Sequence, residues 1–470
     1  MRTTFFGFEI ARRALMAQQT ALEVTGHNVA NANTDGYTRQ RAVLGTTEPF
    51  PAPSYNRPFT TGQLGTGVQV DMIERIRDTF IDNQFRSENH TMGQWEAAES
   101  ALQQIEVILN EPSDVSLSSV FNEFWNAWQE MSKNPESQVA RVSVREQGVT
   151  LANALNHCYE QLNQLRTDLD DNIEIKVDEI NNIARQISGL NEQIIKVEVT
   201  GDQANDLRDK RDLLLDQLSK IIDFTATESQ RGVIIYIQGR PLVVETDIVE
   251  LTTVANPLND GLLDVVWSDN LAAVGIRDGE LYGLLDSRDT KAPYYMNQLD
   301  LLTGNLITEM NALHSAGFGL DSGLGAPTGN GFFSGTGASD IAVNSALSNL
   351  NLIAASQGGE AGDGMNALTI AQLKNALTMG GGTASFGDFY KSIISTLGVE
   401  SQEASRMADN QQLLVEQVTR RKEAVSGVSL DEEVVNMLKY QRGYEAASRL
   451  LTVLDEMLDR IINQTGLVGR

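Results

Sequence analysis

The stretch Ser429–Ile461, SLDEEVVNMLKYQRGYEAASRLLTVLDEMLDRI, repeats apolar residues at a spacing of seven. Two such series run three residues apart, which is the a/d pattern of a coiled-coil helix. The start reads S-x-x-E from Ser429 to Glu432, a capping box that predicts where the helix begins. A seam of this kind needs a partner helix. The first series is Leu430, Met437, Tyr444, Leu451 and Leu458, and the second is Tyr440, Ala447, Leu454 and Ile461.

The beginning of the chain supplies a second narrow apolar seam. Residues from about 4 to 31 are predicted to form a helix in which alanines separate larger apolar residues. The larger residues also recur every seven positions, as Phe8, Leu15, Leu22 and Val29. We therefore expect the two ends of the chain to pair, with the middle of the chain forming an excursion between them.

The first helix is followed by TGHNVANANTDGYTRQ, Thr25 to Gln40. Asn, Asp and Gly offer local hydrogen bonds and tolerate positive φ, so this composition ends a helix. Taken alone, the stretch is a helix stop and a turn.

Between the ends, the spacing of apolar residues changes several times. Residues 41–70 hold four prolines and suggest an extended arm with a hairpin, and the helical period returns from about Asp71 to Ile222, broken at Glu111-Pro112. Its longest part, Leu155 to Ile194, predicts a rod. Short β-branched runs predict a small β region over 226–283, and helices resume on either side of a glycine-rich loop at 317–337.

Composition excludes several classes of protein. The chain has 470 residues with a net charge of −27, which repels nucleic acid and anionic membranes at long range. Cys158 is its one cysteine, so no intramolecular disulfide forms. The first residues carry Glu9, Arg12 and Arg13 where a signal peptide would be apolar, and no run reaches transmembrane length. We expect no nucleic acid partner, no membrane insertion and no cleaved signal.

The sequence offers little sign of catalysis. Its four histidines, His27, His90, His157 and His314, lie far apart and lack zinc-ligand spacing. The glycine-rich loop follows a helix and lacks the Lys-Ser/Thr pair of a phosphate loop. Acidic pairs such as Glu432 and Glu433 are typical of a solvated helix face. We expect no cofactor, no metal and no catalytic residue.

The two ends together resemble the axial proteins of the bacterial flagellum. The stretch NVANANTDGY is similar to the asparagine-rich motif of that superfamily, and GYTRQ (36–40), ANDLRDKRDLLLDQLSKI (204–221), NALHSAGFGLDSGLG (311–325) and VSGVSLDEE (425–433) resemble the hook-associated protein 1 family within it. The family often has Pro where Asp35 stands. The motif residues carried over are Asn28, Asn31, Asn33, Gly36 and Tyr37.

The resemblance implies a mainly α fold with paired terminal coiled-coil helices, a long helical rod and a β-rich outer insertion. The expected parts are an inner domain of residues 1–45 plus 429–470, a rod domain of 46–225 plus 284–428, and a small outer domain of 226–283. Some members carry a further outer domain, but here only a short stretch separates Phe333 from Ile341. In an isolated subunit the terminal seams lack complete partners, so we expect them to fold on assembly.

The implied function is structural: a ring of subunits at the junction of hook and filament, outside the cell, exported without a cleaved signal. Implied partners are further copies of the chain, the hook protein, the second junction protein (hook-associated protein 3) and an export chaperone that holds the C-terminal segment. The seam residues, with Leu454 and Ile461, are expected to pack between helices and subunits. The alternatives are another axial protein, such as the hook protein or the second junction protein, and, more remotely, a secreted wall hydrolase.

Overall fold

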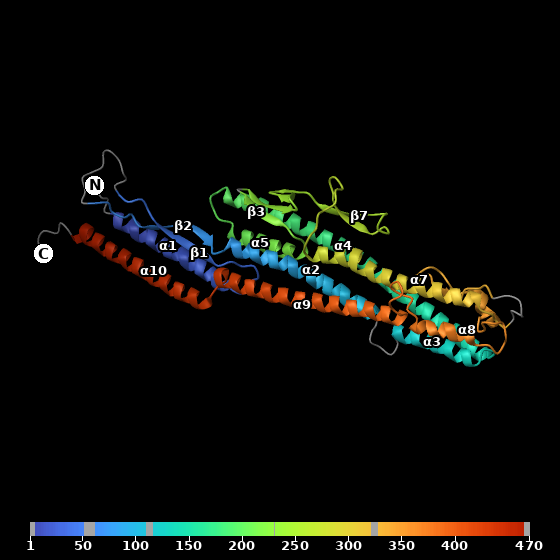
Figure 1. The fold of residues 1–470 in the computed structure, drawn as a ribbon. Helices are drawn as coiled ribbons and strands as arrows, with labels where there is room; N and C mark the ends of the chain where they lie inside the picture. The colour runs from blue at the N-terminus through green and yellow to red at the C-terminus, as the bar shows by residue number, and fades with distance from the viewer. Residues whose placement is uncertain (1–4, 51–61, 110–115, 230, 321–327, 465–470) are drawn as a thin grey trace.

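The computed structural model describes residues 5–50, 62–109, 116–229, 231–320 and 328–464. The molecule is elongated, and its first and last helices, α1 (Phe6–Ala30) and α10 (Leu430–Asp459), lie side by side at one extremity (Figure 1). The other long helices continue from this pair as a rod, and most of the β strands cover one side of the rod. The expected fold class, mainly helical with paired terminal helices and a small β region, is confirmed.

The terminal pair is antiparallel and rests on small residues. Ala11, Ala21 and Ala447 are buried. A Cβ atom added to Gly7 would lie 3.1 Å from the methyl carbons of Leu454, so a larger residue there would require the Leu454 side chain to move. The helices approach closely because these side chains are short.

Most large residues of the predicted seams are not fully enclosed by this contact, although Leu454 packs against Gly7. In a straight helix with 3.6 residues per turn, a strict seven-residue series drifts about 20° per heptad around the axis. Within one chain the seams are therefore only partly covered. Phe8, Leu15, Leu22, Val29, Met437, Leu451, Leu454 and Leu458 are half-buried, whereas Leu430, Tyr444 and Ile461 are exposed.

Helix α10 begins at Leu430, as predicted, but the predicted capping box is wrong. The side chain of Ser429 makes no capping hydrogen bond. Glu432 instead pairs with the guanidinium of Arg39, at 2.7 Å between Nη1 and Oε2. A charged donor makes a stronger hydrogen bond to a carboxylate than a backbone N–H does.

The first and last parts of the arm that follows α1 pair as two antiparallel strands, which we call the hairpin. Strand β1 (Gln40–Thr46) pairs with β2 (Val68–Arg75) and packs on α1. Residues 51–61, with three of the arm's four prolines, lie outside the described residues. Because β2 continues to Arg75, the helical part starts later than the sequence predicted.

The rod is built from α2 (Thr79–Leu109), α4 (Gln138–Glu198), α7 (Ala292–Ala316) and α9 (Phe386–Ser426). Helix α4 has 61 residues and is therefore about 90 Å long at 1.5 Å per residue. Its predicted apolar series is buried from Leu155 to Ile194, apart from the half-buried Leu190. The predicted break at Glu111-Pro112 lies outside the described residues. Shorter helices complete the rod: α3 (Leu117–Lys133), α5 (Asn205–Ile221), α6 (Glu280–Asp286) and α8 (Met365–Gln372).

The β region packs along α4 through side chains that bond to strand backbones. The Asn181 side chain exchanges two hydrogen bonds with Leu251, at 2.8 and 2.9 Å, and Asn191 does the same with Val233. These amides act as an additional strand edge and hold the sheet on the rod. The strands are β3 (Thr225–Ser229), β4 (Gly232–Ile237), β5 (Arg240–Val244) and β6 (Asp247–Ile248) in one sheet, the hairpin β7 (Leu251–Ala255) and β8 (Leu263–Trp267), and, at the far end of the rod, the short pair β9 (Phe333–Ser334) and β10 (Ala342–Val343).

The far end of the rod, which we call the distal tip, has an aromatic core. Phe124, Trp128 and Phe332 are completely buried, with ring centroids 5.2 to 6.4 Å apart. His314 lies within this core, where Nδ1 is 2.7 Å from the Asn330 oxygen and Nε2 accepts from the Ala354 N–H at 3.1 Å. Aromatic pairs of this kind add to the stability given by area burial.

In the described part of the chain, no helix is both long and apolar enough to cross a membrane.

Candidate functional site

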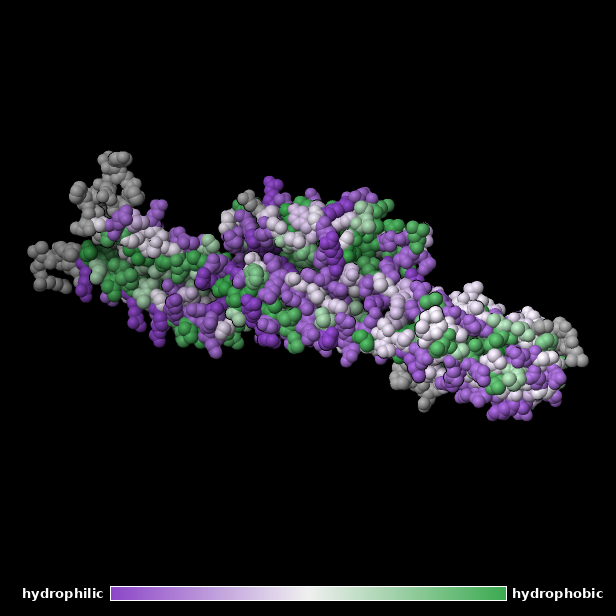
Figure 2. Space-filling model, viewed as in Figure 1, coloured by the Kyte–Doolittle hydropathy of each residue, from purple (hydrophilic) through white to green (hydrophobic). Residues whose placement is uncertain are grey.

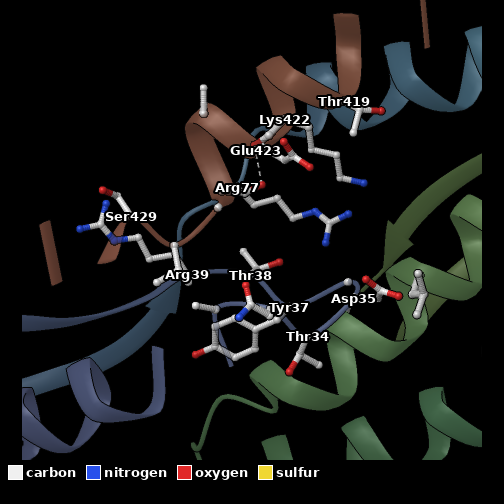
Figure 3. Close-up of a pocket in the computed structure, with 18 of the residues that line it drawn as sticks. Thr34, Asp35, Tyr37, Thr38, Arg39, Arg77, Thr419, Lys422, Glu423 and Ser429 are labelled. Atoms are coloured by element: carbon white, nitrogen blue, oxygen red, sulfur yellow. Dashed lines mark hydrogen bonds between the residues drawn. The ribbon is translucent and has the colours of Figure 1, made fainter. Parts of the chain in front are cut away.

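The asparagine-rich turn lies where the terminal pair meets the rod, and we call this region the joint (Figure 3). It is centred on Asn28, which is 1% exposed. Asn28 Nδ2 donates to the Gln40 oxygen at 2.8 Å and to Glu433 Oε2 at 3.1 Å, while Oδ1 accepts from the Gln40 N–H and the Tyr37 hydroxyl. One amide thus connects α1, the hairpin and α10.

Tyr37 extends this network to His27. Its hydroxyl donates to Asn28 Oδ1 at 2.8 Å, so its remaining contact, with His27 Nδ1 at 3.0 Å, requires the histidine to donate. Burial, and then the nearby charges of Asp206, Asp209 and Glu433, raise the pKa of Tyr37. The phenol therefore remains protonated and keeps its role as a donor.

The other residues of the turn shape its backbone. The His27 carbonyl accepts twice from Asn31, from the backbone N–H at 3.1 Å and from the side-chain Nδ2 at 3.0 Å, which closes the end of α1. Gly36 has a φ of +77°, and a Cβ there would lie 3.1 Å from that of Leu213 on α5. Asn33 is exposed. Asn28 and Tyr37 thus carry the network, Asn31 and Gly36 form the turn, and Asn33 faces solvent.

Glu433 is 2% exposed, which contradicts the interpretation of this acidic pair as a solvated helix face. Its Oε1 is 2.7 Å from Arg39 Nη2, and its Oε2 accepts from Asn28. Burial opposes ionisation of the Arg39 guanidinium, but Glu432 and Glu433 raise its pKa above the ordinary value. The backbone N–H of Arg39 also donates to the Ser426 oxygen at the end of α9, at 2.9 Å. Arg39 therefore joins the hairpin to both C-terminal helices.

Helix α5 presents carboxylates to the same turn. Asp209 accepts from the Thr38 N–H at 2.9 Å and from Arg75 Nη1 at 2.8 Å. Asp206 accepts from Gln40 Nε2 at 2.8 Å. Two carboxylates of α5 thus hold the turn and the start of the hairpin.

Behind the turn lies a cluster of ion pairs whose side chains are buried or half-buried, and we call it the charge cluster. Asp212 lies 2.8 Å from both Arg75 and Arg77. Burial raises the pKa of Asp212, but the charges of Arg77 and Arg75 outweigh it and hold the pKa below the ordinary value. The cluster connects β2, α2, α5 and α9, so it holds the base of the hairpin to the rod. Its other ion pairs are Arg77 with Asp82, Arg86 with Asp216, and Lys422 with Asp216.

A pocket of about 720 Å³ opens between the turn and the link from α9 to α10. Figure 3 shows Arg77 and Lys422 on the side of the pocket that faces the rod. Asp35, Tyr37 and Arg39 lie on the turn that borders the pocket. Arg39, Arg77 and Lys422 of its lining each pair with a carboxylate, so the arrangement is suited to holding helices at a fixed angle.

The histidines are dispersed in the structure, as they are in the sequence. His90 Nδ1 is 2.8 Å from Asp278 Oδ2, far along the chain from His27 and from His314 in the tip. Burial raises the pKa of the Cys158 thiol. Among the residues described, no group of three His, Cys, Asp or Glu side chains could hold a metal ion.

The arginines and aspartates of the joint were not predicted from the sequence. One signal was available: Asp209, Asp212 and Asp216 are spaced by three and four, which places them on one face of α5. Their partners follow β2 and could not be identified from spacing alone.

Comparison with known families assigns the terminal pair, the joint and the rod to a class of protein, the axial proteins of the bacterial flagellum. Family models match in three places: "Flagella basal body rod protein" over residues 8–38, "Flagellar hook-associated protein FlgK helical domain" over 102–333, and "Flagellar basal body rod FlgEFG protein C-terminal" over 424–464. The terminal matches cover nearly all of α1, all of α10 and the whole motif from Asn28 to Tyr37.

Full-length relatives identify the family. The chain is 36% identical to flagellar hook-associated protein 1 of Bacillus subtilis, with all of both chains covered, and 24% identical to those of Escherichia coli and Salmonella typhimurium, over 96% of this chain and 98% of each relative. The chain belongs to the flagellar hook-associated protein 1 family and is a structural component of the bacterial flagellum.

A solved structure shares the fold. The flagellar hook junction protein FlgK from Burkholderia pseudomallei aligns with a TM-score of 0.65 at 17% identity, over 73% of this chain and all of that one.

Proposed function

We propose that the chain forms the junction between hook and filament as a ring of identical subunits. The observation that carries the proposal is the 36% identity over the full length of a hook-associated protein 1. The match of residues 102–333 to the helical domain of that family favours it over the hook protein, because the terminal matches belong to axial proteins in general.

In this role the chain acts through packing and not through catalysis. The charge cluster and Asn28 fix the terminal pair relative to the rod, so a load on one part is transmitted to the other. We assign residues 1–45 plus 429–470 to the inner part, 46–225 plus 284–428 to the rod and 226–283 to the outer part. The half-covered seams, Phe8, Leu15, Leu22 and Val29 with the series from Leu430 to Leu458, would be completed by neighbouring subunits.

The proposed partners are further copies of the chain, the hook protein on one side and the second junction protein, hook-associated protein 3, on the other. An export chaperone would hold the C-terminal segment before export without a cleaved signal. The exposed apolar residues of α10 support a partner there, since Leu430, Val434 and Leu438 are each more than half exposed.

Deletion of residues 430–470 tests the proposal. We expect cells with finished hooks but no filaments, and filament subunits released into the medium. A mutant without hooks would indicate a hook protein, and a mutant with normal filaments and motility would refute the junction role.

A matched pair of substitutions tests the joint. Asn28→Ala leaves Glu433 without one of its donors and should abolish hook–filament joining, because buried polar groups without partners are costly. Asn33→Ala alters an exposed residue of the same turn and should not. Equal motility of the two variants would remove the joint from the mechanism.

A further inference from the structure

The outer β region presents one fully exposed apolar side chain on a rigid loop. Leu258, at the turn between β7 and β8, is 97% exposed. Its N–H donates to Asn256 Oδ1 at 2.9 Å. The next two residues are tied to the rod: Asn259 donates to Asp289 at 3.0 Å, and Asp260 pairs with Arg166 at 3.1 Å. Figure 2 shows hydrophobic surface at this outer end of the β region. We call the side chain and its turn the knob.

A shallow groove lies between α2 and α4, with a volume of about 490 Å³. Its apolar part is Val107, Ile108 and Leu165, and Val107 is 76% exposed. Asp168 is the one charged residue in the lining. Four glutamines surround the apolar residues: Gln103, Gln104, Gln161 and Gln164. An exposed valine within an uncharged setting is the kind of surface that a partner side chain covers.

The knob and the groove lie at the same height on opposite sides of the rod. Arg166 on α4 holds the knob's turn, and Asp170 accepts from the Leu263 N–H where β8 starts. Gln164 and Asp168 line the groove; Gln164 is two positions before Arg166, and Asp168 is two positions before Asp170. At 3.6 residues per turn, side chains two positions apart leave a helix about 160° from each other.

We propose that the knob of one copy inserts into the groove of the next, which makes a head-to-tail contact between subunits. Copies in a ring are related by rotation, so surfaces at equal heights on opposite sides of one rod meet. Asp260 in the knob is paired with Arg166, and Asp168 is the one charged residue of the groove lining. The contact therefore brings little unpaired charge together in a chain with a net charge of −27, where identical copies otherwise repel each other. The inference rests on the proposed ring and names its contact.

Cysteine crosslinking tests the contact and its direction. In a Cys158→Ser background, Leu258→Cys combined with Val107→Cys should give a ladder of crosslinked multimers in isolated flagella after treatment with a short bismaleimide. Each single-cysteine variant should give only monomer, because the proposed contact does not bring two knobs or two grooves together. Crosslinked dimers from a single cysteine, or monomer alone from the double variant in flagella that contain it, would overturn the proposal.

Charge at either surface gives a second test. Leu258→Glu and Val107→Glu should each lower the fraction of hooks that carry filaments, by roughly tenfold, because an unpaired charge is then desolvated in the contact. Leu271→Glu, at a leucine that is 61% exposed elsewhere in the β region, is the control and should have no effect. Normal filaments with either knob or groove variant would refute the contact. If the unaltered chain were itself missing from isolated flagella, the proposed function would be refuted, and not only the contact.

Discussion

The distal tip and the terminal pair differ in how much of their apolar surface one chain can bury. In the tip, Trp128 and Phe332 are completely buried. In the terminal pair, the buried apolar side chains are mostly alanines, and leucines such as Leu430 and Leu450 remain about half exposed. We therefore expect the tip to be stable within a single subunit, and the terminal pair to depend on the joint and on neighbouring copies.

The largest expected effect is in the tip. Trp128→Ala should lower the free energy of unfolding of the rod by about 3–5 kcal/mol, because it removes a fully buried aromatic side chain and leaves a cavity. Chemical denaturation followed by circular dichroism measures this. Leu450→Ala, on a residue 45% exposed in the terminal pair, is the control and should change the same transition little. Equal effects would mean that the two regions unfold as one unit.

A smaller effect is expected in the joint. Asp212→Asn should destabilise the attachment of the hairpin to the rod by about 3 kcal/mol, because Arg75 and Arg77 lose the charge of a shared buried partner. Amide hydrogen exchange in β1 and β2 reports the change. Glu74→Asn affects an exposed pair with Arg41 and should leave exchange nearly unaltered. Indistinguishable exchange in the two variants would contradict a structural role for the cluster.

Acid should weaken the tip before the ion pairs of the joint are protonated. Burial holds the pKa of His314 at about 4, below its ordinary value of 6.5. The unfolded chain therefore binds a proton that the folded tip excludes, so stability is fully present above pH 6.5 and falls by about 2 kcal/mol by pH 5. The thermal midpoint of unfolding measured against pH tests this.

His314→Gln is the matched variant for this pH dependence. It cannot titrate in this range, so its midpoint should lack the decline between pH 6.5 and 4, whatever its stability at pH 7. The same decline in both proteins would assign the effect to another group.

The smallest effect concerns two helix starts. Ser385 caps α9 by accepting from the Asp388 N–H, so Ser385→Ala should destabilise the rod by about 1 kcal/mol. Ser429→Ala at the start of α10 should change stability by no more than a few tenths, because that side chain makes no capping bond. Denaturant midpoints compare them, and a larger loss at Ser429 would show that the cap of α10 forms in solution.

The sequence predicted the parts of the molecule that depend on local periodicity. The spacing of leucines and isoleucines in α4 and of alanines in α1 follows from helix geometry, so the helices and the pairing of the chain ends were predictable. The joint was not, because Asn28 and Glu433 are 405 positions apart and nothing in the spacing of either stretch identifies its partner.

The same reason explains the errors over α10. Glu432 and Glu433 have the composition of a solvated face, and only the position of Arg39 in the fold makes them partners. The β region was predicted from its strands, but its attachment through Asn181 and Asn191 was not, since an asparagine on a helix has no distinctive pattern in sequence.

Hydrogen exchange on the isolated subunit and on the assembled flagellum would show whether the terminal pair needs its neighbours. We expect slow exchange in α4 and α7 in both states, and fast exchange in α1 and α10 that becomes slow only on assembly. Exchange in α1 and α10 of the isolated subunit as slow as in α4 would contradict it, because the terminal pair would then be stable without neighbours.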